Sequence, residues 1–574
     1  MPQTQTAWTT ASRGAPSRFD LIALLLVVGL LAFLAEGSRG VLAPLTTIEA
    51  SPVDLNPWHL PEYAARSTLR MLVAMLVSLL FTFTYATWAA KSERAGRILV
   101  PMLDVLQSVP ILVFLSVTYF WFMSLAPGRI IGAELAVLFG LFTSQAWNMA
   151  FSFYQSLRTV PTELTEAARS FRLSGWATFW RLEVPFAMPP LIWNMMMSMS
   201  GGWFFVVATE AFTVGTRTVT LPGMGAYIAL AIERKDLAAV GWAILAMLVV
   251  ILLYDQLLFR PLVAWADRFR FEQEPGSIPP RSWMLEAMGK SILVARLLRT
   301  MRRTWRQVGA AFTAAPGLPR LESPTHARRL DLAAVIAVAL LLVLAAWETH
   351  KALIVGLTAH EFGVVLGLGA LTTLRVFVLI LLASLVWVPI GVWIGLRPEV
   401  ARIAQPVAQF MAAFPSNLLF PVFVAAIVRW KLNADVWLSP LMILGTQWYI
   451  LFNVIAGASS MPGEMRQVAT NLGVRGWLWW RRVALPAVLP FYVTGALTAS
   501  GGSWNASIVA EVASWGDEHL EAAGLGAYIA SASNAGDPHR LALGAVVMIL
   551  YVLAINRLLW RPLYYFAERK YRLN

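Results

Sequence analysis

The chain contains no cysteine, only six histidines and few charged residues for its length. Without cysteine, disulfides, thiolate metal sites and cysteine nucleophiles are excluded. Charged residues make up 13% of the 574 positions and hydrophobic residues 58%, with a mean hydropathy of +0.64. This composition is too apolar for a soluble protein of this size, and it predicts a polytopic membrane protein in contact with the lipid bilayer.

Motifs of covalent chemistry are also missing. Gly289, Lys290 and Ser291 resemble the end of a phosphate-binding loop, but Met284 stands where the opening glycine should be and no strand precedes it. We find no dinucleotide fingerprint, no paired-histidine metal site and no Ser/His/Asp arrangement. We therefore expect no catalytic residue, no metal and no cofactor on this chain. Any transport it performs must be driven from elsewhere.

The net charge of +13 would suggest nucleic acid as a partner of a soluble protein. In a membrane protein, basic cytoplasmic loops explain it, so no nucleic-acid partner is expected. Most of the 45 Lys and Arg fall on one side of the predicted spans, which places both termini in the cytoplasm. The fold class is therefore all-α, with about 12 transmembrane helices near 21–37, 69–90, 100–124, 132–155, 185–209, 238–258, 332–349, 373–396, 406–428, 434–457, 486–509 and 540–559.

The chain repeats itself. STLRMLVAML from Ser67 matches TTLRVFVLIL from Thr372, and GMGAYI from Gly223 returns as GLGAYI from Gly524. Each copy has six predicted spans, an even number, so the copies are parallel repeats with the same orientation. This pattern predicts a fused pseudo-dimer of two six-helix repeats with a path between the halves.

The repeats set the domain boundaries. A cytoplasmic tail at 1–19 precedes the first repeat at 20–271, and the second repeat covers 331–574. The cytoplasmic linker at 272–330 is rich in basic residues and proline. Within it, 281–307 reads either as an amphipathic helix on anionic lipid or as a solvated basic segment.

Each repeat contains a short basic interruption between its fourth and fifth spans. EAARSFRLSGWATFWRLEVP occupies 166–185, and QVATNLGVRGWLWWRRVALP occupies 467–486. Each reads as a short helix, a break and a second helix that runs into a span begun by proline, with Ser174 as a helix N-cap in the first copy. We expect small side chains here to allow close approach of a partner surface, namely Ala167, Ala168 and Ala469.

These interruptions resemble the EAA loop of ATP-binding-cassette (ABC) importer permeases, which reads Glu-Ala-Ala, three residues, Gly, nine residues, Ile-x-Leu-Pro. The first copy has Arg172 in the glycine place, and the second has Gln467 in the glutamate place but keeps Gly473. In that family the loop is a coupling helix that docks on the ATPase. The resemblance assigns this role to Glu166, Ala167, Ala168, Arg172, Gly175, Pro185, Gln467, Ala469, Gly473, Gly476 and Pro486.

A Trp and a Glu late in span five, before a Gly-x-Gly turn, further resemble the nitrate/sulfonate/taurine/bicarbonate branch. They are Trp203 with Glu210 and Trp504 with Glu511. The resemblance implies the type I importer fold in the bacterial inner membrane, with two permease units fused in one chain. It also implies two cytoplasmic ABC ATPase subunits that bind ATP and Mg, a periplasmic solute-binding protein, and a small anion as solute. The alternatives are a secondary transporter of two fused halves and a non-transporting scaffold.

Polar side chains inside apolar spans either line a watery path or hold helices together. The candidates for the translocation path are Gln107, Gln145, Asn148, Asn194, Gln409, Asn417, Gln447, Asn453 and Asn505.

Four charged residues lie near the outer ends of the spans. We expect Arg70 and Arg375 to snorkel to lipid headgroups, and Glu210 and Glu511 to be structural.

Two prolines recur at matching places in the third span of each repeat. We expect Pro110 and Pro415 to kink this span, because proline interrupts a helix.

Overall fold

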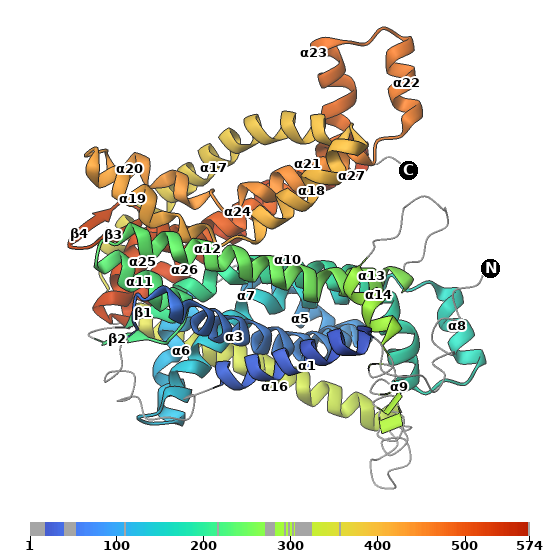
Figure 1. Cartoon of the computed structure of the whole chain (residues 1–574), viewed down its shortest axis with the longest axis horizontal. Coiled ribbons are helices and arrows are strands. Elements are labelled where there is room, and N and C mark those ends of the chain that lie inside the picture. Colours follow the sequence, from blue (N-terminus) through green and yellow to red (C-terminus); the bar gives the residue numbers. More distant parts are fainter. Residues whose placement is uncertain are drawn as a thin grey trace.

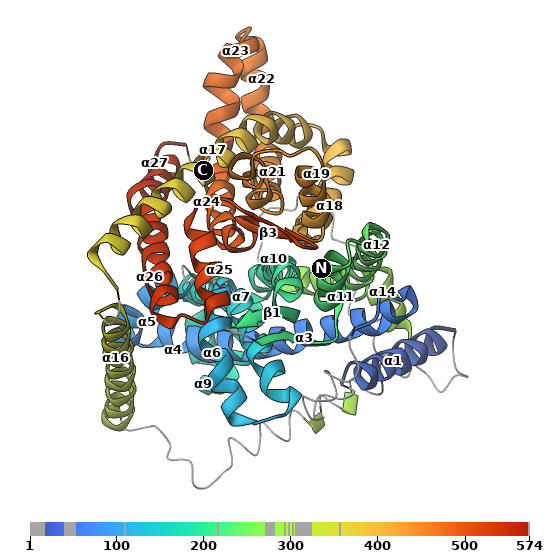
Figure 2. The same cartoon turned by 90° about the vertical axis from the view of Figure 1, so that its left-hand side faces the viewer.

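A computed structural model describes residues 18–38, 53–107, 111–214, 217–269, 282–291 with scattered positions as far as 304, 324–354 and 357–571. The chain is almost entirely helical, and its long helices run roughly parallel to one axis (Figure 1). Most of the second repeat, from α17 onward (yellow to red), lies above the first repeat (blue to green), whereas α16 lies below it, and the two views agree on this (Figure 2).

The first half begins with one apolar helix and continues through five further helical regions. Its elements are α1 (Arg18–Gly37), η1 (Pro57–His59), α3 (Leu60–Phe81), η2 (Thr82–Ala86), α4 (Thr87–Lys91), α5 (Glu93–Leu106), α6 (Ile111–Leu125), α7 (Ile130–Arg158), α8 (Thr162–Ser170), α9 (Gly175–Thr178), η3 (Phe179–Glu183), α10 (Val184–Glu210), β1 (Ala211–Val214), β2 (Arg217–Thr220), α11 (Met224–Glu233), α12 (Leu237–Tyr254), η4 (Asp255–Phe259), α13 (Arg260–Ala266) and η5 (Asp267–Phe269).

The second half repeats this order after the linker helix α14 (Trp283–Lys290). Its elements are α16 (Pro324–Ile354), α17 (Ala359–Gly395), α18 (Pro398–Ala413), η6 (Ser416–Leu418), α19 (Phe420–Arg429), α20 (Ala434–Trp437), η7 (Ser439–Met442), α21 (Gln447–Ser459), α22 (Gly463–Asn471), α23 (Gly476–Trp479), η8 (Trp480–Ala484), α24 (Leu485–Ala510), β3 (Val512–Trp515), β4 (Glu518–Glu521), α25 (Leu525–Ala535), α26 (Pro538–Ile555), η9 (Asn556–Trp560) and α27 (Arg561–Tyr571).

Within the described ranges, seven helices are long and apolar enough to cross a membrane, or eight if the bent pair 434–442 and 447–459 counts as one span. In the predicted third span α5 ends at Leu106 and α6 begins at Ile111, and 108–110 lie outside the described residues. The predicted ninth span is not a single helix, because it is divided into α18 and α19. Pro415 stands in this break with extended backbone, ψ 101°. Proline offers no N–H and clashes with the preceding turn, so the predicted kink is a full break. Pro110 lies outside the described residues.

The outermost helices show that the halves are not copies throughout. α1 packs on α3 of its own half, whereas α16 packs on α5 of the first half and on α26. Val335 and Val338 of α16 lie against the cluster that contains Leu99 and Leu103. The second repeat is therefore tied to the first through α16.

The linker differs from the continuous amphipathic helix expected over 281–307. α14 ends at Lys290, and Ser291 is extended, with ψ 126°. The hydroxyl of Ser291 instead donates to Asp20 of α1 at 2.7 Å in a buried contact. The same hydroxyl accepts from Val294 N at 3.3 Å, and the described positions from 294 to 304 are helical, so Ser291 separates two helical stretches and joins α14 to α1. Most of the remaining segment lies outside the described residues.

The two ends of the helix bundle differ in kind. At one end, each half carries a two-stranded antiparallel hairpin, β1–β2 and β3–β4, which the sequence patterns did not predict. At the opposite end, α8–α9 and α22–α23 protrude from the body on opposite sides (Figure 1). We call these the hairpin end and the loop end.

Candidate functional site

The protruding loops share one backbone turn. α8 ends in a turn in which the N–H of Leu173 donates to Ala168 O at 3.1 Å, and Arg172 has a left-handed φ of 49°. In the second loop Val474 N donates to Ala469 O at 2.9 Å, and Gly473 has φ 65°. Arg172 thus adopts the conformation for which glycine is preferred. Arg172 therefore departs from the family pattern in its side chain but keeps the backbone conformation of the expected glycine.

Each loop continues into a span without an interruption. Ser174 caps α9 by accepting from Ala177 N at 3.2 Å, as predicted. The chain then passes through the single π turn η3 into α10, which has Pro185 in its first turn. η8 and α24 repeat this arrangement with Pro486. Because the helical path is continuous, a force on the loop acts directly on the fifth span.

The alanines of the loops are not equivalent. Ala167 is exposed, as are Glu166 and Gln467, and these three can face a partner. Ala168 and Ala469 are only 6% and 5% exposed. The expectation that they allow approach of a partner is therefore corrected, because both side chains are buried within the chain itself, Ala469 in an apolar cluster that includes Val483.

Different contacts attach the two loops to the spans. In the first half Lys91, at the end of α4, pairs with Glu183 at 2.9 Å and lies 5.6 Å from the ring centroid of Phe179. The ring of Phe179 also packs edge-on against rings of the spans, so an apolar contact accompanies this ion pair. In the second half Ala469 belongs to a buried apolar cluster with partly buried Leu396 beside it, and among the described residues no ion pair accompanies it.

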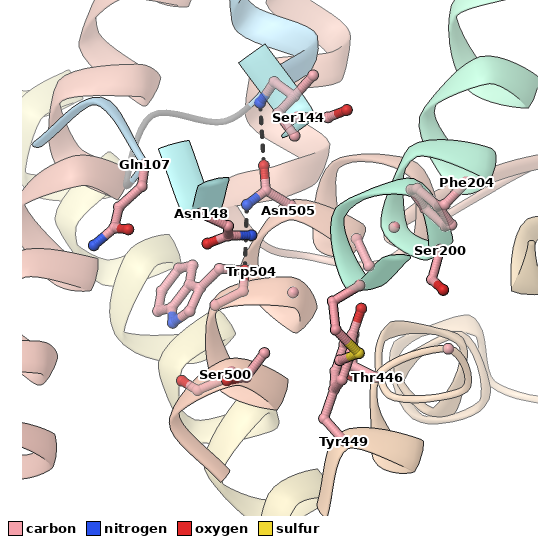
Figure 3. A pocket seen from close by; sticks show the side chains of 18 of the residues that line it. Gln107, Ser144, Asn148, Ser200, Phe204, Thr446, Tyr449, Ser500, Trp504 and Asn505 are labelled. Atoms are coloured by element: carbon pink, nitrogen blue, oxygen red, sulfur yellow. Dashed lines mark hydrogen bonds between the residues drawn. The ribbon is translucent and has the colours of Figure 1, made fainter. Parts of the chain in front are cut away.

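Between the two halves lies a cavity of about 280 Å³ to which both halves contribute (Figure 3). Ser144, Asn148 and Phe204 come from the first half, and Tyr449 and Asn505 from the second. No Asp, Glu, Lys, Arg or His is among the described residues that line it. The cavity therefore offers amides, hydroxyls and aromatic rings, but no full charge, to a solute.

Three of the nine predicted path residues line this cavity: Gln107, Asn148 and Asn505. Asn505 also accepts a hydrogen bond from Ile111 N at 3.1 Å, across the boundary between the halves. Asn417 makes the related contact from the other side by donating to Phe204 O at 2.9 Å. Each of these two asparagines thus joins the third span of one half to the fifth span of the other half.

The remaining predicted path residues lie between helices. Gln447 accepts from Trp387 Nε1 at 2.9 Å, and Asn194 donates to Ser152 Oγ at 3.0 Å. Asn453 donates to Tyr449 O within its own helix at 2.8 Å, and Gln145 is fully buried, with Nε2 3.6 Å from a methionine sulfur. Gln409 lies in α18, but its side chain is outside the described residues. The path role of all nine stays a prediction.

At the hairpin end of the first half, a buried ion-pair network surrounds Arg70. Its guanidinium donates to both carboxylate oxygens of Glu134, at 2.7 and 2.6 Å, and to Glu210 at 2.6 Å. Glu210 also accepts from Ser67 Oγ at 2.6 Å and Gly225 N at 2.7 Å. Arg70 is 5% exposed and Glu210 fully buried, so the network fixes α3, α7 and α10 to the start of α11.

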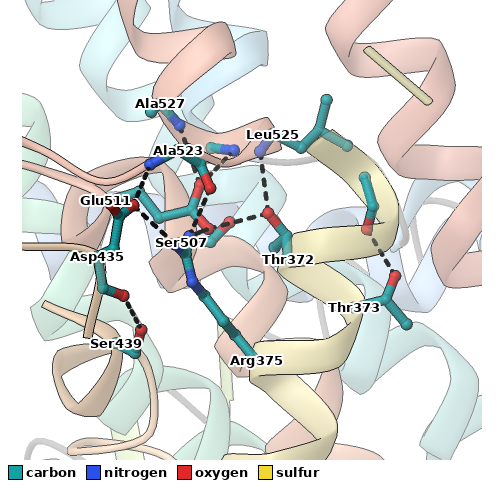
Figure 4. A network of polar contacts seen from close by, with 12 residues as sticks. Thr372, Thr373, Arg375, Asp435, Ser439, Ser507, Glu511, Ala523, Leu525 and Ala527 are labelled. Carbon is teal, nitrogen blue, oxygen red and sulfur yellow. Dashed lines mark hydrogen bonds and ion pairs between the residues drawn. The ribbon is translucent and has the colours of Figure 1, made fainter. Parts of the chain in front are cut away.

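The second half has the same network in a looser form (Figure 4). Arg375 donates to Glu511 and to Asp435, each at 3.2 Å. Glu511 accepts from Thr372 Oγ1 at 2.9 Å and from Gly526 N at 2.7 Å. Asp435 replaces Glu134 but its side chain is 53% exposed.

These networks correct one expectation and add residues that the sequence did not single out. Arg70 and Arg375 do not snorkel, because both are held in ion pairs. Glu134 and Asp435 were missed, although they stand at matching places of the repeats.

The networks also explain the Gly-x-Gly turn. A Cβ at Gly223 would overlap the carboxylate of Glu210, and one at Gly524 that of Glu511. Glycine is required at both places by close approach.

The halves also meet at the hairpin end itself. The tip of β3–β4 reaches α11, where Gly516 N donates to Ile232 O at 3.1 Å. Beside it, Lys235 of the first half pairs with Asp517 at 3.3 Å. The hairpin end is therefore closed by contacts between the halves.

This architecture defines a class: a polytopic helical membrane protein built from two fused copies of one unit. The chain belongs to the family described as binding-protein-dependent transport system inner membrane component, whose sequence profile matches residues 69–260 and again 387–570. The duplication and the predicted family are thereby confirmed.

Several curated proteins are similar over part of the chain. The nitrate import permease protein NrtB of Leptolyngbya laminosa is 27% identical over 184 residues, covering 32% of this chain and 62% of the relative. The glycine betaine/proline betaine permease ProW of Escherichia coli is 27% identical over 184 residues, covering 32% and 48%. The bicarbonate permease CmpB of Synechococcus elongatus is 28% identical over 131 residues, covering 23% and 46%. The chain thus covers about half of the length of these relatives.

Proposed function

We propose that this chain is the membrane permease of an ATP-driven importer in the bacterial inner membrane, with both termini in the cytoplasm. The observation that carries the proposal is the pair of matched loops. Each loop is continuous with the fifth span of its half, and the two fifth spans line a cavity that both halves share. Closure of two ATPase subunits on the loops would move both fifth spans. The cavity would then open alternately to the two faces of the membrane.

The partners follow from this role. Two cytoplasmic ABC ATPase subunits, carrying ATP and Mg, dock on the loop end, and a periplasmic solute-binding protein delivers the solute at the hairpin end. The chain supplies no nucleotide site of its own. A secondary transporter is less well supported, because the described lining of the cavity has no carboxylate or basic side chain for ion coupling.

The solute is small, and nitrate, sulfonate, taurine and bicarbonate are the first candidates. Relatives named for nitrate and bicarbonate support an anion, whereas those named for glycine betaine support a zwitterion at similar identity. A cavity without full charges holds an anion weakly, since hydrogen bonds from amides and hydroxyls repay only part of the cost of its desolvation and no opposite charge repays the rest. We therefore assign selectivity mainly to the binding protein.

The test uses proteoliposomes that contain the full chain, its ATPase and the binding protein. We expect ATP-dependent solute uptake that is lost when 166–185 and 467–486 are both replaced by Gly/Ser-rich segments of equal length. As a matched control, replacing the exposed residues of the α19–α20 turn should leave ATPase association unchanged. Normal association and stimulation of the ATPase after replacement of both loops would contradict the coupling role.

A further inference from the structure

The two loops have different charges on matched surfaces. Loop 1, residues 162–183, contains three glutamates and three arginines. Loop 2, residues 463–484, contains one glutamate and four arginines: Arg466, Arg475, Arg481 and Arg482. All four arginines are exposed, and within the described ranges none of them forms an ion pair. Four arginines against one glutamate give loop 2 a formal charge of +3, whereas three of each give loop 1 a formal charge of 0.

The apolar residues of the two loops, in contrast, correspond. Phe171 and Leu472 occupy the same place after the first short helix and are 79% and 74% exposed. Trp176 and Trp477 occupy the same place in the second, with 47% and 74% exposed. Large apolar side chains left this exposed mark an interaction surface. Both loops thus have similar apolar anchors, and charge is the main difference between them.

We propose that loop 2 docks in an acidic groove of its ATPase subunit and forms the stronger, salt-sensitive contact, whereas loop 1, without net charge, docks mainly through its apolar anchors. The inference rests on the proposed function, because it assumes that an ATPase binds both loops. Guanidinium groups form bidentate hydrogen bonds with carboxylates, which adds affinity and orientation. Two ATPase subunits would present the same acidic groove to both loops, and only loop 2 has the opposite net charge.

The shape of the loop end favours a protein over lipid as the occupant. α22 and α23 protrude from the body of the protein, beyond the ends of the neighbouring spans (Figures 1 and 2). Anionic headgroups could still neutralise the arginines, so lipid is tested as a separate outcome.

Because the chain has no cysteine, a single reporter can be placed on each loop. Ser170→Cys and Asn471→Cys occupy matching exposed positions at the ends of α8 and α22. Each variant of the full chain is labelled with an environment-sensitive fluorophore, placed in zwitterionic nanodiscs and titrated with the ATPase subunit purified from the transporter's own complex. At low salt we expect the Asn471 reporter to respond at a roughly tenfold lower ATPase concentration.

Salt and charge variants then identify the cause. At about 0.5 M salt the difference between the reporters should fall below roughly threefold, because exposed charges are screened. Arg481→Gln with Arg482→Gln should remove the difference at low salt, whereas the matched Arg181→Gln in loop 1 should change little. Leu472→Ala should weaken loop 2 equally at both salt concentrations.

Three results would overturn the proposal. Equal salt dependence at both loops would show that charge does not distinguish them. A response of the Asn471 reporter in phosphatidylglycerol nanodiscs without ATPase would assign the arginines to lipid. Silence of both reporters while the ATPase is bound would contradict the proposed coupling role itself, and so separates the two failures.

Discussion

The two repeats use the same buried network at the hairpin end but enclose it differently. Around Arg70, three carboxylate oxygens lie within 2.7 Å and Glu134 is 10% exposed. Around Arg375, both carboxylates are at 3.2 Å and Asp435 is 53% exposed. Asp435 is one methylene shorter than Glu134 and lies in the short helix α20 at the surface, so it holds Arg375 less tightly. The first half therefore has the more buried and more closely paired network of the two at this end.

The same division appears at the loop end. Both loops are attached to the spans by apolar packing, and among the described residues only loop 1 adds an ion pair, Lys91 with Glu183. Duplication preserved the backbone of both halves, while the contacts around it diverged. The comparison teaches that equivalent positions need not contribute equally, and substitutions in matched pairs can measure the difference.

The largest expected effect concerns the two buried arginines. Arg70→Met leaves Glu134 and Glu210 buried without a counter-charge, which should lower the free energy of unfolding by about 3–5 kcal/mol. Arg375→Met should cost only about 1–3 kcal/mol, because Asp435 keeps contact with water and Glu511 keeps its other donors. Denaturant unfolding of the purified chain measures both. A larger loss from Arg375→Met would reverse the comparison.

A matched pair at the Gly-x-Gly turn should instead show no difference. Gly223→Ala and Gly524→Ala each place a Cβ against a buried glutamate carboxylate. We expect each to cost about 1–3 kcal/mol, the usual range for an overfilled core, and to differ by less than about 1 kcal/mol. Tolerance of one but not the other, measured by the same unfolding assay, would show that the looser network also relaxes its glycine.

The sequence predicted the parts of the molecule that depend on periodic pattern. The duplication, the apolar helices and the two-part loops with their proline-started spans all agree with the structure. The sequence did not predict that α16 packs on the first half, nor which residues pair with Arg70, because both depend on which helices pack together. A charged residue at a span end looks the same in sequence whether it reaches headgroups or a buried carboxylate such as Glu134.

The path residues show the same limit. Gln145 and Gln447 stand at matching positions, which suggested a shared role, yet one is fully buried and the other bonds to Trp387. Asn505 lines the cavity and also joins the halves. Polarity inside a span indicates that a partner is needed, but packing decides whether that partner is water or another helix.

A smaller effect is expected at the left-handed turns of the loops. Arg172→Gly should raise the free energy of unfolding by about 0.5–1 kcal/mol, because relief of the left-handed strain at φ 49° outweighs the freedom that glycine adds to the unfolded chain. Gly473→Arg should lower it by a similar amount. A shift of the unfolding midpoint in opposite directions supports the shared turn. Stabilisation by both substitutions would show that the loops differ in backbone after all.

The smallest effect tests the attachment of loop 1. Lys91→Met removes an ion pair whose lysine is 47% exposed, so we expect a loss of less than about 1 kcal/mol that disappears at high salt. Leu396→Ala beside loop 2 should cost more and should not respond to salt, since apolar packing is not screened. Unfolding at about 0.05 and 0.5 M salt distinguishes them. Equal salt responses would mean that the Lys91–Glu183 pair adds no electrostatic contribution to the attachment of loop 1, and this difference between the loops would be wrong.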